Sequence, residues 1–457
     1  MAAKQWKIAL AGECMTSRTF SQCEDPEFLQ VIEKLRGADL TLAHLEMNLG
    51  DAEEIRWPSR NDWVASFMIA EGHVADDFKW AGVDMLSLAH NHSFDWGPDG
   101  VLSTIRHCRR NGITVAGTGR DLEEARKPGY CETRRGRAAV ISVSTGNKNN
   151  EWAGLPKATM QGRPGVNPLR IQVTHQVDAE AAKQLRRIAH RLGIEYNKFD
   201  RIEGAIRLVF PEHLSNRNVP LFMEGEDFRV ISKCHPGDLA GNVRAVDEAR
   251  EMADMVIVSH HYANSDGPRG DYPPQFAVEF AHACIDAGAD IYFAHGWHRT
   301  LGVEIYKGKP IIYGAGNFFA HSEFNLRVPA DSYESWGHDV DQMPMHNPAA
   351  DPLHPGLDQE TWWSSVLWEV TMEDHNVAEL RLHPLNLGRD PATRGKITRP
   401  VGSGKHPKTD GRPYMANSED GSVILGRIRD ISKPLGTTMT IENNVGIVRP
   451  SASGTGR

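Results

Sequence analysis

The chain has 457 residues, 40% of them apolar, and a formal net charge of -9 at pH 7. That amount of apolar sequence is sufficient for one large domain with insertions or for roughly two to three domains. The acidic excess, without any block of lysine or arginine, excludes the charge pattern of proteins that bind nucleic acid or anionic membranes. We therefore expect a folded enzyme with neither of these as a partner.

Two features of the chain indicate a cytoplasmic protein. The longest apolar run near the N-terminus, Ile8 to Gly12, is shorter than the roughly 7 to 15 residues of a signal-peptide core and the roughly 18 of a membrane span. The six cysteines form no Cys-x-x-Cys pair, so we expect reduced, mostly buried thiols. Cys14 alone lies in a candidate site, where we interpret it as a structural thiol rather than a base.

Short apolar runs alternate with amphipathic stretches along most of the chain, which is typical of βαβ units. Helical spacing with Gly or Asn at the exits predicts helices at residues 27–36, 97–111 and 272–288. The predicted strands are residues 7–12, 38–46, 84–90, 113–119, 138–144, 255–261, 290–296 and 309–317.

The pattern breaks twice. Residues 146–249 are polar at first and contain a long helix at 179–193, which predicts an inserted cap that closes over a substrate. Residues 326–359 lack periodicity and predict a long loop at the entrance to the site. We expect a catalytic domain at 1–325, and at 326–457 that loop followed by strands and a helix on the same domain. The elements expected there are strands at 362–370, 377–385 and 437–444 and a helix near 418–432.

Acid, amide and imidazole side chains follow the apolar runs. Because the carboxyl ends of parallel strands meet at one edge of a sheet, these side chains are expected to converge on one pocket. The clusters are Glu13 with Cys14, His44 with Glu46, His90-Asn91-His92 with Asp95, His260-His261, and His295-Gly296-Trp297-His298.

Each cluster also has a structural interpretation. Glu13 and Glu46, taken singly, could be surface carboxylates. Asp95 either caps the next helix or orients His92 through its second ring nitrogen. Successive strand side chains alternate between faces, so either His260 or His261 can face the pocket, but not both.

The order of these segments resembles the CapA-type proteins of poly-gamma-glutamate capsule synthesis. The resemblance covers residues 5–325 and is carried by LAGECMTSR, DLTLAHLEMNL, LSLAHNHSFDWGPDG, VAGTGRDLEEA, VIVSHHYANSD, HGWH and KGKPIIYGAGNFF. It implies the calcineurin-like metallophosphoesterase fold, a four-layer α/β/β/α sandwich with the site where the loops of two central sheets meet. The cap and the C-terminal extension would be additions to that fold.

The chain departs from the family's motifs at ligand positions. The family has Asp at Glu13, Asn at His44 and at His90, and His-Pro-His where this chain has Gly296-Trp297-His298. A two-metal site holds its ions about 3.5 to 4 Å apart on fixed ligands, so these losses weaken it. We expect no cofactor; a single divalent ion (Mn, Zn or Fe) would be held by Glu13, Asn91, His261 and His298.

The chain also resembles the peptide epimerases of lasso-peptide biosynthesis, which invert a C-terminal tryptophan. This resemblance implies a precursor peptide as partner and proton transfer at Cα by an acid and a base, without metal. We assign His295 and Glu13 as the bracketing pair, with His92 and His260 able to take the place of His295. The expected substrate-binding residues are His90, Asn91, His298, Trp297, Glu46 and Asp95, and Trp96, Trp152 and Trp297 are candidate aromatic walls.

Two other functions remain open. The chain could be a metal-dependent hydrolase or transferase acting on gamma-glutamyl polymer, peptide or phosphoester. It could also be a binding or assembly protein that has lost catalysis, although several adjacent ionisable groups argue against that. Metal content and sensitivity to EDTA separate the first of these from an epimerase.

Overall fold

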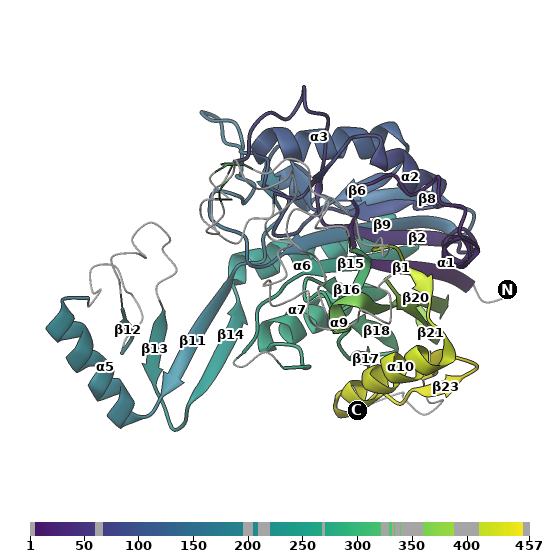
Figure 1. The fold of residues 1–457 in the computed structure, drawn as a ribbon. Coiled ribbons are helices and arrows are strands. Elements are labelled where there is room, and N and C mark those ends of the chain that lie inside the picture. The colour runs from purple at the N-terminus through teal and green to yellow at the C-terminus, as the bar shows by residue number, and fades with distance from the viewer. Residues whose placement is uncertain are drawn as a thin grey trace.

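The computed structural model describes residues 5–59, 67–194, 204–208, 220–266, 270–320, 360–387 and 411–450, with a few residues between 329 and 339. Most of the loop expected at 326–359 lies outside these ranges. Two sheets form the body of the protein, and a smaller sheet projects from it (Figure 1).

The larger sheet has ten strands among the described residues and is built around β1 (Gln5–Met15). On one side β1 pairs in parallel with β2 (Leu40–Leu45), and on the other it pairs antiparallel with β20 (Ser364–Glu373). The other strands are β5 (Met85–Ser87), β6 (Thr114–Ala116), β19 (Asn317–Ala320), β21 (Asn376–Asn386), β22 (Tyr414–Met415), β23 (Thr440–Glu442) and β24 (Val445–Val448).

The second sheet has six strands in the order β17-β18-β16-β15-β9-β8. Its central strands β9, β15, β16 and β18 are parallel, so their carboxyl ends share one edge. The strands are β8 (Gly129–Thr133), β9 (Gly136–Ser144), β15 (Met255–His261), β16 (Ile291–His295), β17 (Val303–Tyr306) and β18 (Lys309–Ile312).

The two sheets pack face to face, with Ile8, Leu42, Ile257, Phe293 and Trp368 among the buried side chains between them. Helices cover both outer faces (Figure 1). The four-layer α/β/β/α sandwich is therefore confirmed, as are the strands and helices expected in its body. The helices on the ten-stranded sheet are α1 (Pro26–Arg36), α2 (Val74–Trp80) and α3 (Gly97–Arg110). The helices on the six-stranded sheet are α6 (Pro236–Met252) and α7 (Gln275–Asp286). The helix α10 (Ser418–Ser432) packs into the inner core between the sheets.

The remaining short elements connect these layers. They are β3 (Asn48–Leu49), β4 (Ile69–Ala70), β7 (Thr118–Gly119), α4 (Leu122–Arg126), β10 (Gly165–Val166), α9 (Glu360–Trp363) and a 3₁₀ turn at Lys433–Leu435. No helix within the described ranges is both long and apolar enough to cross a bilayer.

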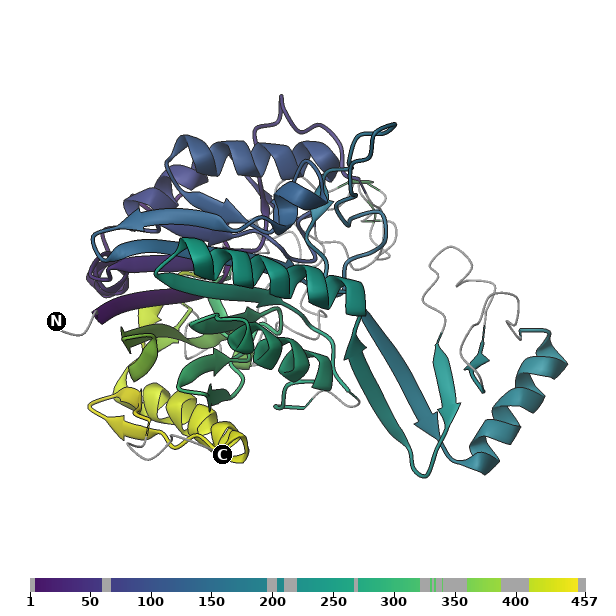
Figure 2. The ribbon, with the colours of Figure 1, turned by 180° about the vertical axis from the view of Figure 1, so that it is seen from behind.

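The insertion forms an arm that projects away from the body (Figures 1 and 2). Its elements span Ile171–Cys234, a narrower range than the expected cap at 146–249. The helix α6, which we had placed in the cap, packs against β9 and β15 because Ala245, Val246 and Ala249 belong to the outer core. The arm consists of β11 (Ile171–Val177), α5 (Ala179–Leu192), β12 (Ile206–Arg207), β13 (Leu221–Glu224) and β14 (Arg229–Cys234).

Candidate active site

Buried ionisable side chains gather where β1, β2, β15 and β16 end. They form two adjoining groups, each with its ligand-type atoms within 4.8 Å of one another. One group is Glu13, Glu46 and His298, and the other is His44, His261 and His295. The convergence expected from the strand ends is therefore what the structure shows.

Glu13 is held from three directions. Its Oε1 accepts hydrogen bonds from the backbone N–H groups of Gly296 (2.5 Å) and His298 (3.2 Å), and its Oε2 contacts Nδ1 of His298. Gly296 has φ +110°, and a Cβ there would lie 2.5 Å from the carbonyl oxygen of Tyr262, so this loop requires glycine. Burial opposes ionisation, but the charge and hydrogen bond of His298 hold the pKa of Glu13 well below its usual range.

His298 lies between two carboxyl groups. Its Nε2 is 3.8 Å from Oε1 of Glu46, on the side opposite Glu13. Burial alone would lower the pKa of His298, but Glu13 and Glu46 raise it to about 9. Burial, reinforced by the charge of Glu13 and a side-chain hydrogen bond with it, raises the pKa of Glu46 well above its usual range. Glu46 is thus a carboxyl group kept neutral next to an imidazolium.

We expect the stability of the protein to fall as the pH rises through about 9, because His298 then loses its proton. Protonated His298 contributes its full stabilisation below pH 6.5, the ordinary pKa of histidine, and that stabilisation is lost as the pH rises above about 9. Glu13 has the opposite pH dependence because its pKa is lowered. Its contribution to folding stability is complete above pH 4.5 and is lost as the pH falls below that value. The melting temperature measured from pH 6 to 10 tests this: His298→Asn should flatten the alkaline decline, and an unchanged decline would contradict it.

His44, His261 and His295 form a group of neutral imidazoles. Nδ1 of His261 lies 3.2 Å from both Nε2 of His44 and Nδ1 of His295. The outer nitrogens of His44 and His295 are each 2.8 Å from a serine hydroxyl, those of Ser87 and Ser259. Burial and the neighbouring imidazoles lower the pKa of all three rings, that of His261 to about 3. At neutral pH the three rings are therefore uncharged, and each has one nitrogen without a proton.

Asp95 orients His92, as one of our two interpretations had it. Its Oδ2 accepts hydrogen bonds from Nδ1 of His92 (2.8 Å) and from the backbone N–H of Met68 (3.0 Å). The helix α3 has Trp96 at its N-cap and no side-chain cap, so Asp95 does not cap it. The ring of Trp96 packs in a separate small core with Phe67, which makes it a structural residue.

The turn after β5 brings His90 to the same site, and Asn91 follows it in the turn. The ring of His90 lies edge-on to His44, with centroids 5.4 Å apart. Oδ1 of Asn91 is buried without a hydrogen-bond partner among the described residues. The sequence did not point to Asn147, whose Nδ2 donates to the carbonyl of His90 and to Glu151, both at 3.1 Å.

Two expected site residues lie elsewhere. His260 points to the opposite face of β15, where it contacts Phe280 and the hydroxyl of Tyr292, because successive strand side chains alternate. Trp297 packs edge-on against Tyr262 in the outer core under α6 and α7. The structure therefore removes His260 from the candidate catalytic residues and Trp297 from the substrate-binding residues.

Trp362 and Asn317 are site residues that the sequence did not identify as such. The ring of Trp362, in α9, packs on His298 with centroids 4.3 Å apart. Asn317 links the two: its Oδ1 accepts from Nδ1 of His298, and its Nδ2 donates to the carbonyl of Trp362, both at 3.0 Å. Asn317 follows an apolar run, as the other clusters do, and this position in the sequence could have identified it as a site residue.

The imidazole group does not fit a shared metal ion. The rings of His44 and His295 are stacked, with centroids 3.4 Å apart and planes 17° apart. A bound ion lies in the plane of each ligating ring, about 2.0 to 2.1 Å from the nitrogen. Two nearly parallel planes at this separation do not meet at that distance, so both rings cannot bind one ion in this arrangement.

The paired metal centre of the metallophosphoesterase fold does not fit either. Glu13 is occupied by N–H donors, Gly296 has no side chain, and Sγ of Cys14 points to the carbonyl of Gly12. One ion could still use Glu46, whose Oε1 lies 3.8 Å from Nε2 of both His261 and His298. Glu46 thus takes the place that we had given to Glu13 in a single-ion site.

Comparison with known families agrees with this architecture. Residues 7–322 match the family described as "Bacterial capsule synthesis protein PGA_cap". The chain belongs to this family. The matched range contains every cluster described above except Trp362, so the site of this PGA_cap protein lies in the part that the family shares.

Individual relatives extend the comparison. The chain is 30% identical over 452 residues to the uncharacterized protein y4sH of Sinorhizobium fredii, which covers 97% of this chain and 92% of that protein. It is 33% identical over 330 residues to the capsule biosynthesis protein CapA of Bacillus anthracis, and the match covers 68% of this chain and 59% of that protein. A probable polyglutamine synthesis accessory protein of Mycobacterium tuberculosis is 27% identical over 302 residues, and the match covers 64% of this chain and 58% of that protein.

Proposed function

We propose that this PGA_cap protein is an epimerase that moves a proton at Cα of the C-terminal residue of a peptide, without a metal ion. The observation that carries the proposal is the contact between two buried side chains, the carboxyl of Glu46 and the imidazole of His261, whose Oε1 and Nε2 lie 3.8 Å apart. Groups whose pKa values are pushed apart in this way are typical of an acid and a base that act as a pair.

The roles follow from protonation states. An imidazole of the His44, His261 and His295 group takes the Cα proton, and the electron pair left on carbon is delocalised into the substrate's carboxylate. Glu46 then donates its proton to the opposite face of the carbon. The proton held by the imidazoles returns to Glu46, with His261 as the nearest ring. Both ring nitrogens of His295 are engaged, by Ser259 and His261, so His295 acts through His261. Glu46 replaces Glu13, whose carboxylate is already occupied.

His298 supports this chemistry as a fixed positive charge. Its raised pKa keeps it protonated at neutral pH, where it can attract the carboxylate of the substrate as negative charge develops there. Trp362 packs on its ring and Asn317 fixes its Nδ1, so the imidazolium cannot turn away. The resemblance to lasso-peptide epimerases leads us to propose tryptophan as the C-terminal residue and a ribosomally made precursor as the substrate.

We expect the protein stripped of metal with EDTA to remain active. In D2O, a tryptophan-ending precursor peptide should gain one deuterium at Cα and yield the D-residue, as read by mass spectrometry and chiral analysis. His295→Asn should abolish the exchange, and an exposed control, Glu53→Gln, should leave it unchanged. Exchange that requires added Mn²⁺ or Zn²⁺ would contradict the metal-free mechanism.

A second candidate is a metal-dependent hydrolase or transferase of the CapA type, acting on gamma-glutamyl polymer, peptide or phosphoester. The donor set of Glu46, His261 and His298 favours it, as do the capsule and polyglutamine functions in the names of the relatives. A bound ion would supply a Lewis acid there. Stoichiometric metal in the purified protein, with loss of mass from poly-gamma-glutamate, would support this function instead.

A further inference from the structure

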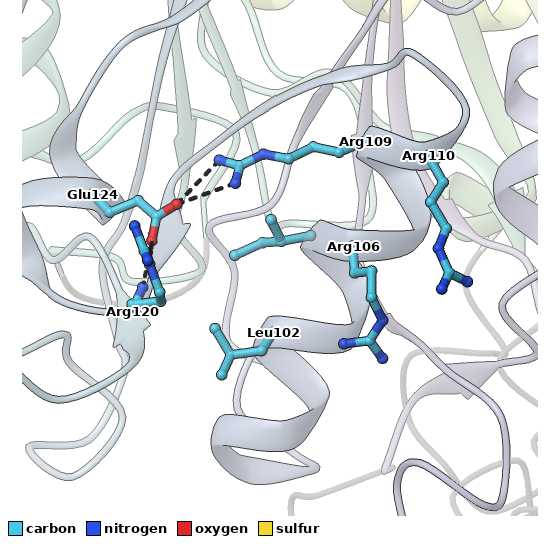
Figure 3. A pocket seen from close by; sticks show the side chains of 7 residues that line it. Leu102, Arg106, Arg109, Arg110, Arg120 and Glu124 are labelled. Carbon is cyan, nitrogen blue, oxygen red and sulfur yellow. Dashed lines mark hydrogen bonds and ion pairs between the residues drawn. The ribbon is translucent and has the colours of Figure 1, made fainter.

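A cavity of about 560 Å³ lies on α3, outside the candidate active site. Figure 3 shows Arg109 and Arg120 turned toward Glu124, while Arg106 and Arg110 extend from the same helix as Arg109. The lining residues are Leu102, Ile105, Arg106, Arg109, Arg110, Arg120 and Glu124.

The cavity is positively charged although the chain as a whole is acidic. Its lining has four arginines against one glutamate, Glu124, which Arg109 and Arg120 share at 3.2 and 2.8 Å. Arg106 pairs with Glu54, outside the lining, at 2.6 Å. Arg110 is exposed and has no carboxylate partner among the described residues, so its guanidinium is available to a ligand.

We propose that this cavity binds acidic side chains of the peptide substrate, upstream of the residue that reacts. The inference rests on the proposed peptide substrate. Guanidinium groups match carboxylates through paired N–H donors, and Leu102 and Ile105 supply an apolar floor for the methylene groups of glutamate. A carboxylate-bearing ligand would balance the charge of Arg110 and the excess charge of Arg109 and Arg120, which share a single carboxylate.

The position of α3 relates the cavity to the active site. The helix begins at Gly97, two residues after Asp95, which holds His92 in the site. Arg106 lies nine residues farther along, which at 1.5 Å per residue is about 14 Å of helix. An extended peptide spans that distance in about four to five residues. A separation of about five residues between the acidic side chains and the C-terminus therefore matches the length of helix between the start of α3 and Arg106.

The test uses the full chain and two labelled synthetic peptides that end in tryptophan. One carries three glutamates about five residues upstream, and the other has glutamines in their place. We expect the glutamate peptide to bind more tightly, by an amount that shrinks as salt is added. Arg110→Gln should weaken its binding about three- to fivefold and Arg106→Gln with Arg110→Gln roughly tenfold. The matched control, Arg134→Gln, removes one exposed arginine elsewhere and should change nothing.

The outcomes separate this inference from the proposed function. If both peptides bind equally and undergo Cα exchange, the cavity has no such role and the epimerase proposal stands. If the glutamate peptide binds through Arg110 but shows no exchange, the cavity is a binding site and the epimerase proposal fails. Tighter binding of a single-stranded oligonucleotide than of the glutamate peptide, lost in the same variants, would overturn the inference in favour of a nucleic-acid partner.

Discussion

Replacement of Glu46 by glutamine is expected to lower the rate of Cα exchange by about 10²- to 10⁴-fold, the usual contribution of a general acid or base. Glutamine has nearly the same shape but cannot give up a carboxyl proton. The fold should persist, since the amide of glutamine can still donate a hydrogen bond to Glu13, the partner of Glu46. Deuterium incorporation at saturating peptide, with circular dichroism as the check on folding, measures the effect.

The same variant distinguishes the two candidate functions. If the protein is a metal-free epimerase, Glu46→Gln changes the rate and leaves an already low metal content unchanged. If Glu46 is a metal ligand, the variant loses bound metal together with activity. Exchange at the wild-type rate would show that Glu46 is not the acid, and the pairing of a neutral carboxyl with neutral imidazoles would then have no catalytic role.

Replacement of Glu13 by alanine is expected to cost about 3 to 5 kcal/mol of folding stability, because it removes one partner of a buried ion pair. The change leaves the imidazolium of His298 without its closest carboxylate and frees the backbone N–H groups of Gly296 and His298. Urea unfolding of the wild type and the variant measures this loss.

Glu13→Gln provides the matched control, since its amide oxygen can still accept from the two N–H groups. It should be less destabilising than Glu13→Ala. The double variant Glu13→Ala with His298→Ala should lose less stability than the two single changes added together, because both remove the same interaction. Additive losses would mean that the ion pair does not stabilise the fold.

The sequence predicted the body of the fold because each strand and helix there has a local signal. Runs such as 255–261 and 290–296 end in ionisable residues, and parallel pairing then brings their ends together. The choice between His260 and His261 could not be made in this way. Every residue of β15 is buried, since helices cover one face and the other sheet covers the opposite face, so no alternation of polarity marks the pocket side.

Other features depend on contacts between distant parts of the chain. The saturation of Glu13 by donors from residues 296 and 298, and the packing of Trp362 on His298, arise only when these segments meet. The expected end of the cap at 249 was too late because α6, with Gly and charged residues in its sequence, gave a weak local signal although it packs on the central sheet. The role of Glu46 likewise follows from its surroundings, not from its motif.

The pairing of β1 with β20 affects the order in which the protein can fold. Gln5 lies opposite Glu373, so β1 finds one of its neighbours only after β20, which lies far along the chain, has been made. Until then β1 has an open edge, and open edges of apolar strands recruit strands from other molecules. The larger sheet therefore cannot be completed before Glu373, the last residue of β20, has been made, and β1 is exposed to association with other chains until then.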